Sequence, residues 1–504
     1  MNKTPFLPII HGEIAPRAAI PRLAVPEFRA ATLEAVSRGN RIVSFFGHPV
    51  DHNQIELIVV LADDARGALS TASAVVKENY PALTPDCPQA HWFEREIAEQ
   101  WAVTPVGHPW LKPIRFHAPY HADGHKTCFP SAGPGITDYF RVEGEEIHEV
   151  AVGPVHAGII EPGHFRFQCH GENVFHLEIE LGYQHRGIER RLRQGPDKKT
   201  IHYLETAAGD STIAHTMAFC HNLEALGSTR PNARAQVLRG IALELERLAN
   251  HTGDLGALAG DIGFLPTASY CGRIRGDWLN MTAVICGNRF GRGLIRPGGT
   301  DYDLDETLAG ELKARLDAAE RDTANAVELL WQTGSVMARF EETGSLSAAT
   351  AAALGLVGPA ARASGLMRDA RQDFPSGIFR YAQIPVSTWQ SGDVFARAFV
   401  RWLEIQRSID FIREQLKMPE GDQMRKSISR LEPNAMAVSL IEGWRGEICH
   451  AALTDAHGQL EHYKMVDPSF HNWFGLAMAM RGQQISDFPL CNKSFNLSYC
   501  GHDL

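Results

Sequence analysis

The sequence lacks any apolar run long enough to cross a bilayer. A membrane-spanning helix needs about 20 apolar residues in succession, and the run from Ile55 to Ala62 is already close to the longest. The opening residues Met-Asn-Lys-Thr-Pro-Phe-Leu-Pro have no extended apolar core and contain early prolines, so no secretory signal is expected. We therefore expect a cytosolic chain that reaches a membrane only through other proteins.

Paired cysteines are also missing. The nine cysteines include no C-x-x-C pair, and their number is odd. This usage indicates reduced cytosolic thiols and not a disulfide framework. Cys491 and Cys500, near the C-terminus, are expected to be inert buried thiols.

Basic charge is scarce as well. The chain has 49 Lys and Arg against 59 Asp and Glu, a net charge of -10. Nucleic-acid binding needs a concentrated basic surface, so no nucleic-acid partner is expected. The sequence contains no G-x-x-x-x-G-K-[ST], no strand-borne G-x-G-x-x-G, no G-x-S-x-G and no H-E-x-x-H, which leaves nucleotide binding and the common hydrolase sites unsupported.

What is present is ordinary globular composition, with 44% hydrophobic and 21% charged residues in 504, which excludes a disordered or fibrous chain. Hydrophobic periodicity in residues 1–116 predicts a small α+β domain. A segment rich in His, Pro and Gly, residues 117–146, predicts a linker. The expected elements of the first domain are helices at Ala31–Val36, Leu69–Asn79 and Trp92–Trp101, and strands at Arg41–Phe46 and Ile55–Leu61.

Residues 147–504 predict a second, mainly α-helical domain with a small β layer. Short strands come first, and amphipathic helical periodicity follows. The Gly- and Arg-rich stretch Gly287–Gly299 is interpreted as a packed turn. The expected strands are Ala151–Val152, His164–Cys169 and Val174–Ile179, and the expected helices are Ala235–His251, Thr307–Glu342 and Phe395–Lys417.

Several motifs, in register along nearly the whole chain, resemble one superfamily: the large subunits of membrane-bound (group 4) nickel–iron hydrogenases, of the formate hydrogenlyase type, and the D-type subunit of complex I (NADH-quinone oxidoreductase). The N-terminal part resembles the C-type subunit of complex I, so the arrangement is that of fused C-type and D-type subunits. The matching segments are Trp92–Glu96, Gly107–Leu111, Val152–His156, Glu180–Glu189, Glu244–His251, Arg296–Gly299, Leu354–Gly355, Gly358–Pro359, Arg362–Gly365, Gly392–Arg397 and Glu442–Gly446.

The metal ligands of that superfamily are absent. Nickel–iron sites need four soft thiolates, which the family supplies as two C-x-x-C pairs. The early ligand positions fall on Ala208 and Ser211, with the motif's histidine kept as His215; the late ones fall on Pro489 and Asn492, and Cys491 is one place out of register. A nickel–iron hydrogenase is therefore the third and disfavoured interpretation, and no metal is expected.

The quinone-site pattern of the related complex I subunit is present only in part. His156 matches the first histidine of G-P-x-H-P-x-x-H, but the second falls on Ile160. The family's tyrosine has no counterpart between Ala208 and Ser211. Glu161 and Tyr203 are the candidates for replacing the missing groups, since two-electron quinone reduction needs two protons from hydrogen-bonded acids.

Three catalytic candidates come from the resemblance. Glu189 matches a proton-passing glutamate; the alternative is a helix-start carboxylate paired with Arg190 and Arg191. Arg445 matches an arginine above the family's cavity; the alternative is an ion pair with Glu442 or Glu447. His215 is interpreted as mainly structural. We expect Glu189, His215 and Arg445 to line one cavity with the segments Ala208–Ser211 and Asp487–Asn492.

Two further sets complete the prediction. His185, Arg186 and His251 match positions facing an iron–sulfur partner, where positive charge would raise a cluster's reduction potential; ordinary core or interface histidines are the alternative. Arg397, Arg401 and Glu404 lie on one helical face at i, i+4 and i+7, which predicts an intrahelical salt-bridge ladder.

The resemblance implies a peripheral-arm subunit of a complex I-related oxidoreductase, peripheral to the inner face of the cell membrane, that takes part in electron transfer to or from a quinone or a similar small carrier. Its expected partners are a small iron–sulfur subunit, which would hold the cluster, and membrane subunits. No cofactor is expected to bind this chain directly. The alternative is a structural, conformation-coupling subunit of the same complex without chemistry of its own.

Overall fold

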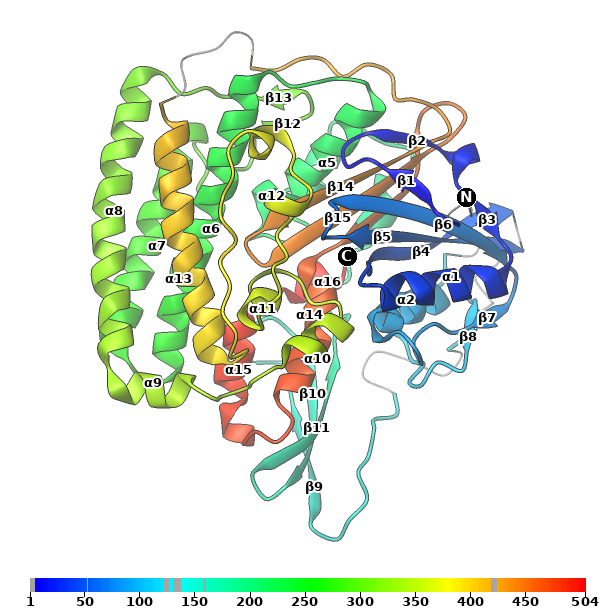
Figure 1. Cartoon of the computed structure of the whole chain (residues 1–504), viewed down its shortest axis with the longest axis horizontal. Helices are drawn as coiled ribbons and strands as arrows, with labels where there is room; N and C mark the ends of the chain where they lie inside the picture. Colours follow the sequence, from blue (N-terminus) through cyan, green and yellow to red (C-terminus); the bar gives the residue numbers. More distant parts are fainter. Residues whose placement is uncertain (1–4, 52, 121–126, 130–136, 157–159, 418–423) are drawn as a thin grey trace.

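The computed structural model describes residues 5–51, 53–120, 127–129, 137–156, 160–417 and 424–504. Figure 1 shows a β-rich region at the N-terminal end, a helical bundle on the opposite side and a narrow β-sheet projecting from the body. Within these ranges, no helix is both long and apolar enough to cross a membrane. Two parts of the predicted linker, residues 121–126 and 130–136, lie outside the described residues.

An antiparallel sheet with strand order β1–β6–β5–β4 forms the N-terminal region, and β3 pairs with β6 in parallel. Helices α1 and α2 pack against it. The bounds are β1 Leu7–Ile9, β3 Arg22–Leu23, α1 Val25–Ser37, β4 Arg41–Asp51, β5 Gln54–Asp63, β6 Ala68–Val76 and α2 His91–Trp101, with β7 Asn79–Pro81 and β8 Thr104–Val106 as a separate parallel pair.

The expected helix at Leu69–Asn79 is wrong, because these residues form β6 and the start of β7. Residues 71–74 of β6 are all fully buried, since the strand lies between β5 and the β1–β3 edge. A strand covered on both faces loses the polar–apolar alternation that identifies strands. The other expected elements of this region are present.

The second region begins with the projecting sheet, order β11–β10–β9, and continues into the bundle. The expected strands and helices of this part are present, although Thr307–Glu342 breaks at Thr333 into α8 and α9. The bounds are β9 Ile147–Val152, β10 His164–His170, β11 Asn173–Glu180, α3 Ile188–Leu192, α4 Thr200–Leu204, α5 Thr212–Leu226, α6 Ala233–Asp261, α7 Leu265–Cys286, α8 Glu306–Gln332, α9 Gly334–Phe340, α10 Ala348–Ala353, α11 Gly358–Ala363, α12 Ala370–Asp373 and α13 Val394–Gln415.

The stretch Gly287–Gly299 is a packed turn, as predicted. It leads into a hairpin of β12 (Ile295–Arg296) and β13 (Gly299–Thr300). A Cβ on Gly298 would lie 1.9 Å from the carbonyl oxygen of Lys426, so only glycine fits where the two backbones meet.

A four-stranded sheet near the C-terminus is the main feature that the sequence patterns did not predict. Its order is β16–β15–β14–β2, and β2 comes from the N-terminal end of the chain. One continuous hydrophobic core includes residues from both regions. The predicted domain boundaries stay a prediction. The bounds are β2 Ile14–Pro16, β14 Ala435–Gly443, β15 Gly446–Thr454, β16 Leu460–Val466, α14 Pro468–Ala479, α15 Phe488–Phe495 and α16 Tyr499–His502.

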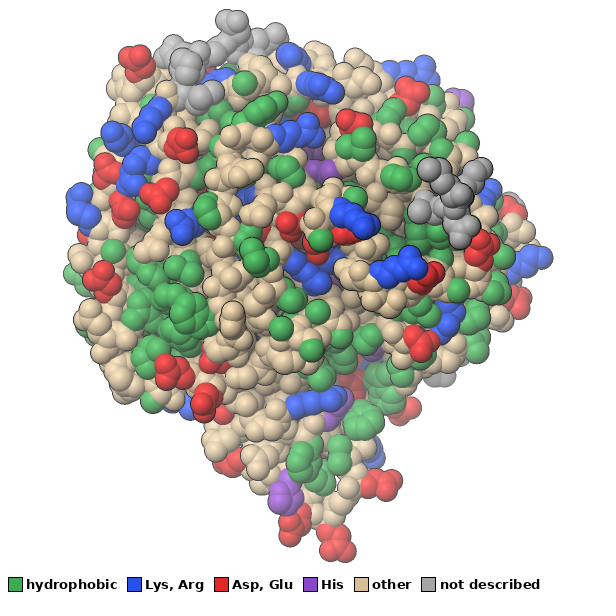
Figure 2. All heavy atoms as spheres, in the orientation of Figure 1, with side chains coloured by type: hydrophobic (Ala, Val, Ile, Leu, Met, Phe, Trp, Pro, Cys, Tyr) green, Lys and Arg blue, Asp and Glu red, His purple; other side chains and the backbone are tan. Residues whose placement is uncertain are grey.

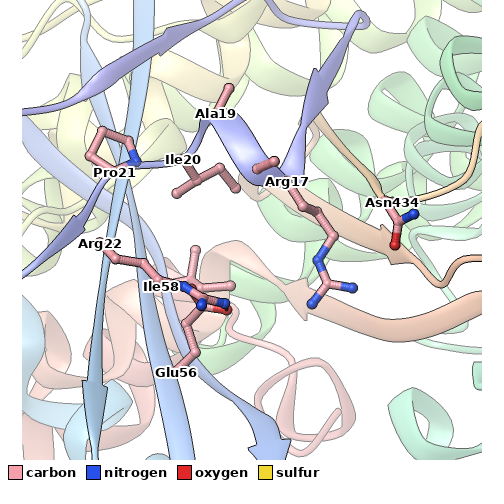
Figure 3. Close-up of a pocket in the computed structure, with 9 residues that line it drawn as sticks. Arg17, Ala19, Ile20, Pro21, Arg22, Glu56, Ile58 and Asn434 are labelled. Atoms are coloured by element: carbon pink, nitrogen blue, oxygen red, sulfur yellow. The ribbon is translucent and has the colours of Figure 1, made fainter.

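The segment from β2 to β3 connects the two large sheets and forms one wall of a surface cavity of about 760 Å³. Figure 3 shows Arg22 against Glu56 on one side of this cavity and Arg17 on the other. Arg17 donates to the carbonyl of Thr454 and pairs with Glu461. These contacts fix the N-terminal segment onto the C-terminal sheet.

Candidate functional site

Asp210 and Arg445 form the centre of the candidate site. Asp210 lies in the loop before α5, where the resemblance places the first two metal-ligand positions, and Arg445 lies in the turn between β14 and β15. Both guanidinium ends of Arg445 donate to the Asp210 carboxylate, at 2.6 and 2.7 Å. The Asp210 side chain is 36% exposed, and that of Arg445 is 5% exposed. Asp210 raises the pKa of Arg445 against the effect of burial. A bidentate pair of this kind fixes geometry as well as charge.

The loop is held by its backbone too. The carbonyl of Asp210 accepts from the Asn250 side chain at 2.9 Å and from the indole of Trp444 at 2.8 Å. The Trp444 ring also stacks with the Arg445 guanidinium, at 3.9 Å from the ring centre. The predicted pairing of Arg445 with Glu442 or Glu447 is wrong, because those carboxylates bind arginines on other elements.

Two glycines allow the turn that carries Arg445 to reach this position. A Cβ on Gly358 would lie 2.1 Å from the carbonyl oxygen of Arg445, and one on Gly446 would lie 2.8 Å from the Cα of Gly358. Both residues have positive φ, +67° and +133°. Backbones this close leave no space for a side chain, so α11 and the turn fit only with glycine at both positions.

Glu246, on α6, is a candidate residue that the sequence patterns did not single out. Its carboxylate accepts from the backbone amides of Ile213 and Ala214, in the first turn of α5, at 2.7 and 3.3 Å. Burial, with a smaller contribution from Asp210, raises the pKa of Glu246 to about 8. A carboxyl whose pKa lies this close to neutral pH is suited to proton transfer. Its position inside the matched Glu244–His251 segment was the available signal.

A buried hydrogen-bonded chain lies behind this loop. His215 Nε2 contacts Asp467 at 3.0 Å, His215 Nδ1 contacts His450 Nε2 at 3.1 Å, and His450 Nδ1 contacts the Tyr463 hydroxyl at 2.9 Å. All four side chains are essentially unexposed. Although burial favours the neutral acid, His215 brings the pKa of Asp467 below its ordinary value. An ionised Asp467 accepts a hydrogen bond from His215, so His215 accepts from His450, and His450 accepts from the Tyr463 hydroxyl. All the donors in this row of hydrogen bonds therefore point from Tyr463 towards Asp467.

Glu189 lies on the opposite face of the C-terminal sheet. Its carboxylate accepts from Lys464 Nζ at 2.9 Å and from the amide of Met465 at 2.8 Å. Lys464 follows Tyr463 in β16, and successive side chains of a strand point to opposite faces. The expected single cavity lined by Glu189, His215 and Arg445 is therefore not formed.

The Glu189 cluster links the two regions of the chain. Lys464 also binds Glu96 on α2 at 2.7 Å, and Glu96 pairs with Arg115. Burial opposes ionisation, but Lys464 and Arg115 lower the pKa of Glu96 to about 2, whereas burial raises the pKa of Glu189. The predicted pairing of Glu189 with Arg190 and Arg191 is wrong, because these arginines stack over the rings of Tyr120 and Tyr203.

The remaining predicted site residues lie in several places. His185 stacks on His117 at 4.8 Å and contacts the carbonyl of Asp503, and Arg186 donates to the carbonyls of Thr206 and Ala207. His251 is fully buried on Glu404, so it has no exposed edge to present to a partner. The cluster-facing role of these three residues stays a prediction.

The quinone-pattern residues also lie apart. His156 contacts the carbonyl of Gly163 at 2.8 Å, and residues 157–159 of its loop lie outside the described residues. Glu161 accepts from the amide of Tyr499, whereas the Tyr203 hydroxyl accepts from Arg191. These contacts hold Glu161 and Tyr203 on different partners, and their substitution for the family's groups stays a prediction.

The former metal positions do not fit a metal. Ala208 is buried, Ser211 is the N-cap residue before α5, and Pro489 and Asn492 lie in α15. Burial raises the pKa of both Cys491 and Cys500 to about 11, which makes their thiolates scarce. Across the described residues, no group of three or more His, Cys, Asp and Glu side chains is arranged to hold a metal ion.

The predicted ladder on α13 is wrong. Arg397 binds the Gly344 and Gly392 carbonyls, Arg401 pairs with Asp254 on α6, and Glu404 binds Arg362 on α11. The helical face is buried, so each charge binds a group on another element.

The fold joins a β-rich N-terminal region to a mainly helical one, and matches to known protein families assign both to subunits of an oxidoreductase complex. Residues 31–130 match the family described as the respiratory-chain NADH dehydrogenase 30 Kd subunit, and residues 261–436 match its 49 Kd subunit. The chain thus joins the two kinds of domain in one polypeptide, as the resemblance implied.

Curated relatives support the same assignment to oxidoreductase-complex subunits. The carbon monoxide-induced hydrogenase of Rhodospirillum rubrum is 32% identical over 69% of this chain and 97% of its own length. Formate hydrogenlyase subunit 5 of Escherichia coli is 30% identical over 84% of this chain and 76% of its own length. The D-type subunit of NADH-quinone oxidoreductase from Clostridium beijerinckii is 28% identical over 64% and 87%. The chain belongs to this family of complex I-related and hydrogenase-type oxidoreductase subunits.

Proposed function

We propose that this chain takes part in the reduction or oxidation of a quinone or a similar two-electron carrier beside Asp210 and Arg445. The observation that supports it most is the partly exposed Asp210–Arg445 pair with Glu246 close behind it. Arg445 supplies fixed positive charge where a reduced carrier gains negative charge. Glu246, protonated at neutral pH, is the acid that donates a proton to the carrier oxygen.

The electrons would come from an iron–sulfur cluster in a small partner subunit, and membrane subunits would hold the assembly at the inner face of the cell membrane. The relatives named as subunits support the existence of partners. A partly exposed aromatic cluster on α8, α13 and the segment before α13 supports an interface: Trp331, Trp389, Phe395 and Phe399. Figure 2 shows hydrophobic side chains gathered on this side of the molecule, over the lower part of α13. Aromatic side chains are enriched in interface cores.

A structural, conformation-coupling role is the second candidate. It is favoured by the way in which every predicted catalytic residue is already paired inside the chain: Glu189 with Lys464, His215 with Asp467, and Arg445 with Asp210.

The test uses the complex that co-purifies with this chain from solubilised membranes. Glu246→Gln should lower quinone turnover by about 100-fold or more, because general acids contribute about that much, with assembly unchanged. Glu189→Gln is the matched control, since it removes a buried carboxylate on the other face of the sheet. Full turnover in Glu246→Gln would refute catalysis here and favour the structural role. Metal analysis should find several irons and no nickel, and about one nickel per chain would contradict the proposal.

A further inference from the structure

Beneath the Arg445 turn lies a second buried cluster, made of side chains from several segments, that the proposed reaction does not use. Four carboxylates and three guanidinium groups contact one another there, and each is between 0% and 5% exposed. They are Glu244 and Arg247 on α6, Arg362 on α11, Asp369 before α12, Arg371 on α12, Glu404 on α13 and Glu442 on β14.

Each arginine of the cluster pairs with two or three carboxylates. Arg247 binds Glu244 and Glu404, Arg371 binds Glu244 and Asp369, and Arg362 binds Asp369, Glu404 and Glu442. Three positive charges therefore face four carboxylates. An unbalanced charge in a water-free interior is costly, and proteins relieve it by binding a proton.

The neighbouring charges do not correct the imbalance. Glu447, opposite Glu442 in the β14–β15 pairing, binds Arg41, which also binds Asp64. Arg368 pairs with Asp64 in turn. These two carboxylates and two arginines balance each other. Asp373, half-buried on α12, accepts from the amide of Asp369 and adds no positive charge.

His251 is the other group that could take the proton. Its Nε2 contacts Glu404 at 2.8 Å, but its Nδ1 is buried and has no hydrogen-bond partner among the described residues. A second N–H there would have no acceptor. Burial lowers the pKa of His251 to about 4, whereas burial raises the pKa of Glu442 to about 7. Glu442 is the better site, because its one ion pair among the described residues is with Arg362, whereas each of the other three carboxylates pairs with two arginines.

Glu442 is also joined directly to the turn that carries Arg445. Arg247 donates to the backbone carbonyls of Glu442 and Gly443, at 2.7 and 3.1 Å. The ring of Trp444 lies against His251, with 6.2 Å between ring centres, and its indole N–H holds the Asp210 carbonyl. A change of charge at Glu442 therefore acts on the groups that position Arg445 and Asp210.

We propose that this cluster holds one exchangeable proton at Glu442, so that the Arg445 turn lies over a site of variable charge. The protonation site follows from the cluster itself. Its coupling to carrier reduction rests on the proposed function, where it would offset part of the negative charge that a reduced carrier brings.

The test is infrared titration of the full chain between pH 5 and about pH 9. A protonated carboxylic acid has a C=O stretch that a carboxylate lacks. We expect a band with a midpoint near pH 7, from the pKa of Glu442, that is lost in Glu442→Gln and kept in Glu447→Gln. Asp373, Glu99 and Glu246 have pKa values of about 6, 7 and 8, so their amide variants identify their bands.

If Glu442→Gln does not fold, Glu442→Asp is the second variant, and it should shift the midpoint of one band only. A set of bands that Glu442 substitutions leave unchanged would overturn the inference. The readout is independent of turnover, so failure of the carrier proposal leaves this result standing, and the reverse also holds.

Discussion

Two of the buried charge clusters in this chain differ in the balance between their positive and negative charges. The Lys464 cluster has two carboxylates and two cations, and it joins α2 of the N-terminal region to β16 of the C-terminal sheet. The Glu442 cluster has four carboxylates and three arginines within the C-terminal region. In the balanced cluster each carboxylate has a compensating cation, whereas the proton proposed at Glu442 would offset the excess carboxylate of the unbalanced one.

The largest expected effect is in the balanced cluster. Lys464→Met leaves Glu96 and Glu189 facing each other with only Arg115 nearby, and removing one partner of a buried pair costs about 3–5 kcal/mol. Urea unfolding measures the loss. The double variant with Glu189→Gln should regain part of it, because one uncompensated charge is gone. A loss below about 1 kcal/mol would show that water reaches Lys464.

The second prediction contrasts the pH dependence of the clusters. The raised pKa of Glu442 means that the native state keeps a proton that the unfolded chain releases, so its contribution is complete below about pH 4.5 and is lost as the pH rises through about 7. The difference in unfolding free energy between wild type and Glu442→Gln should therefore fall over that range, by at most about 1.4 kcal/mol per pH unit.

The pH dependence of the stability contributed by Glu96 has the opposite sign to that of Glu442. Its pKa is lowered to about 2, so its contribution is present above the unfolded value and is lost only as the pH falls towards 2. The corresponding difference for Glu96→Gln should be level between about pH 4.5 and 7. Parallel profiles for the two variants would contradict the comparison.

A smaller effect is expected where the backbone alone supports the site. Gly358→Ala places a Cβ against the Arg445 carbonyl at a positive φ, and this overpacking should cost about 1–3 kcal/mol. Gly209→Ala is the control, because nothing lies within 4 Å of a Cβ there. Thermal unfolding that is equal for the two variants would show that the turn can move.

The smallest effect is expected in the hydrogen-bonded chain that runs from Tyr463 to Asp467. Tyr463→Phe removes the donor to His450 and should cost about 1 kcal/mol, the usual net value of one hydrogen bond. Ordinary urea titration measures it. Asp467→Asn should cost more, since it also removes the negative charge that orients His215, and the reverse order would contradict the direction assigned to the chain.

The sequence predicted the features that depend on local hydrophobic pattern and on motif spacing. The α2 helix, the early strands and the long helices of the bundle are present, and the loss of thiolates at Ala208 and Ser211 is evident in the sequence. Pairing across the chain could not be predicted this way: Asp210 meets Arg445, and Glu189 meets Lys464, through a sheet that no periodicity indicated. The prediction of a salt-bridge ladder on α13 was wrong for a related reason. Helical spacing alone does not indicate whether a helix face is buried against other elements.

The pairing of β2 with β14 has a consequence for the order of assembly. Arg17 and its carbonyl acceptor on Thr454 are 437 residues apart in the chain, and synthesis at about 5–20 residues per second would separate their appearance by tens of seconds. Strand β2 must wait, unpaired, until β14 has been made, although β1 and β3 can pair with β6 much earlier. The growing chain therefore exposes an open strand edge for that time, and the last sheet to form is the one that joins its first residues to its final third.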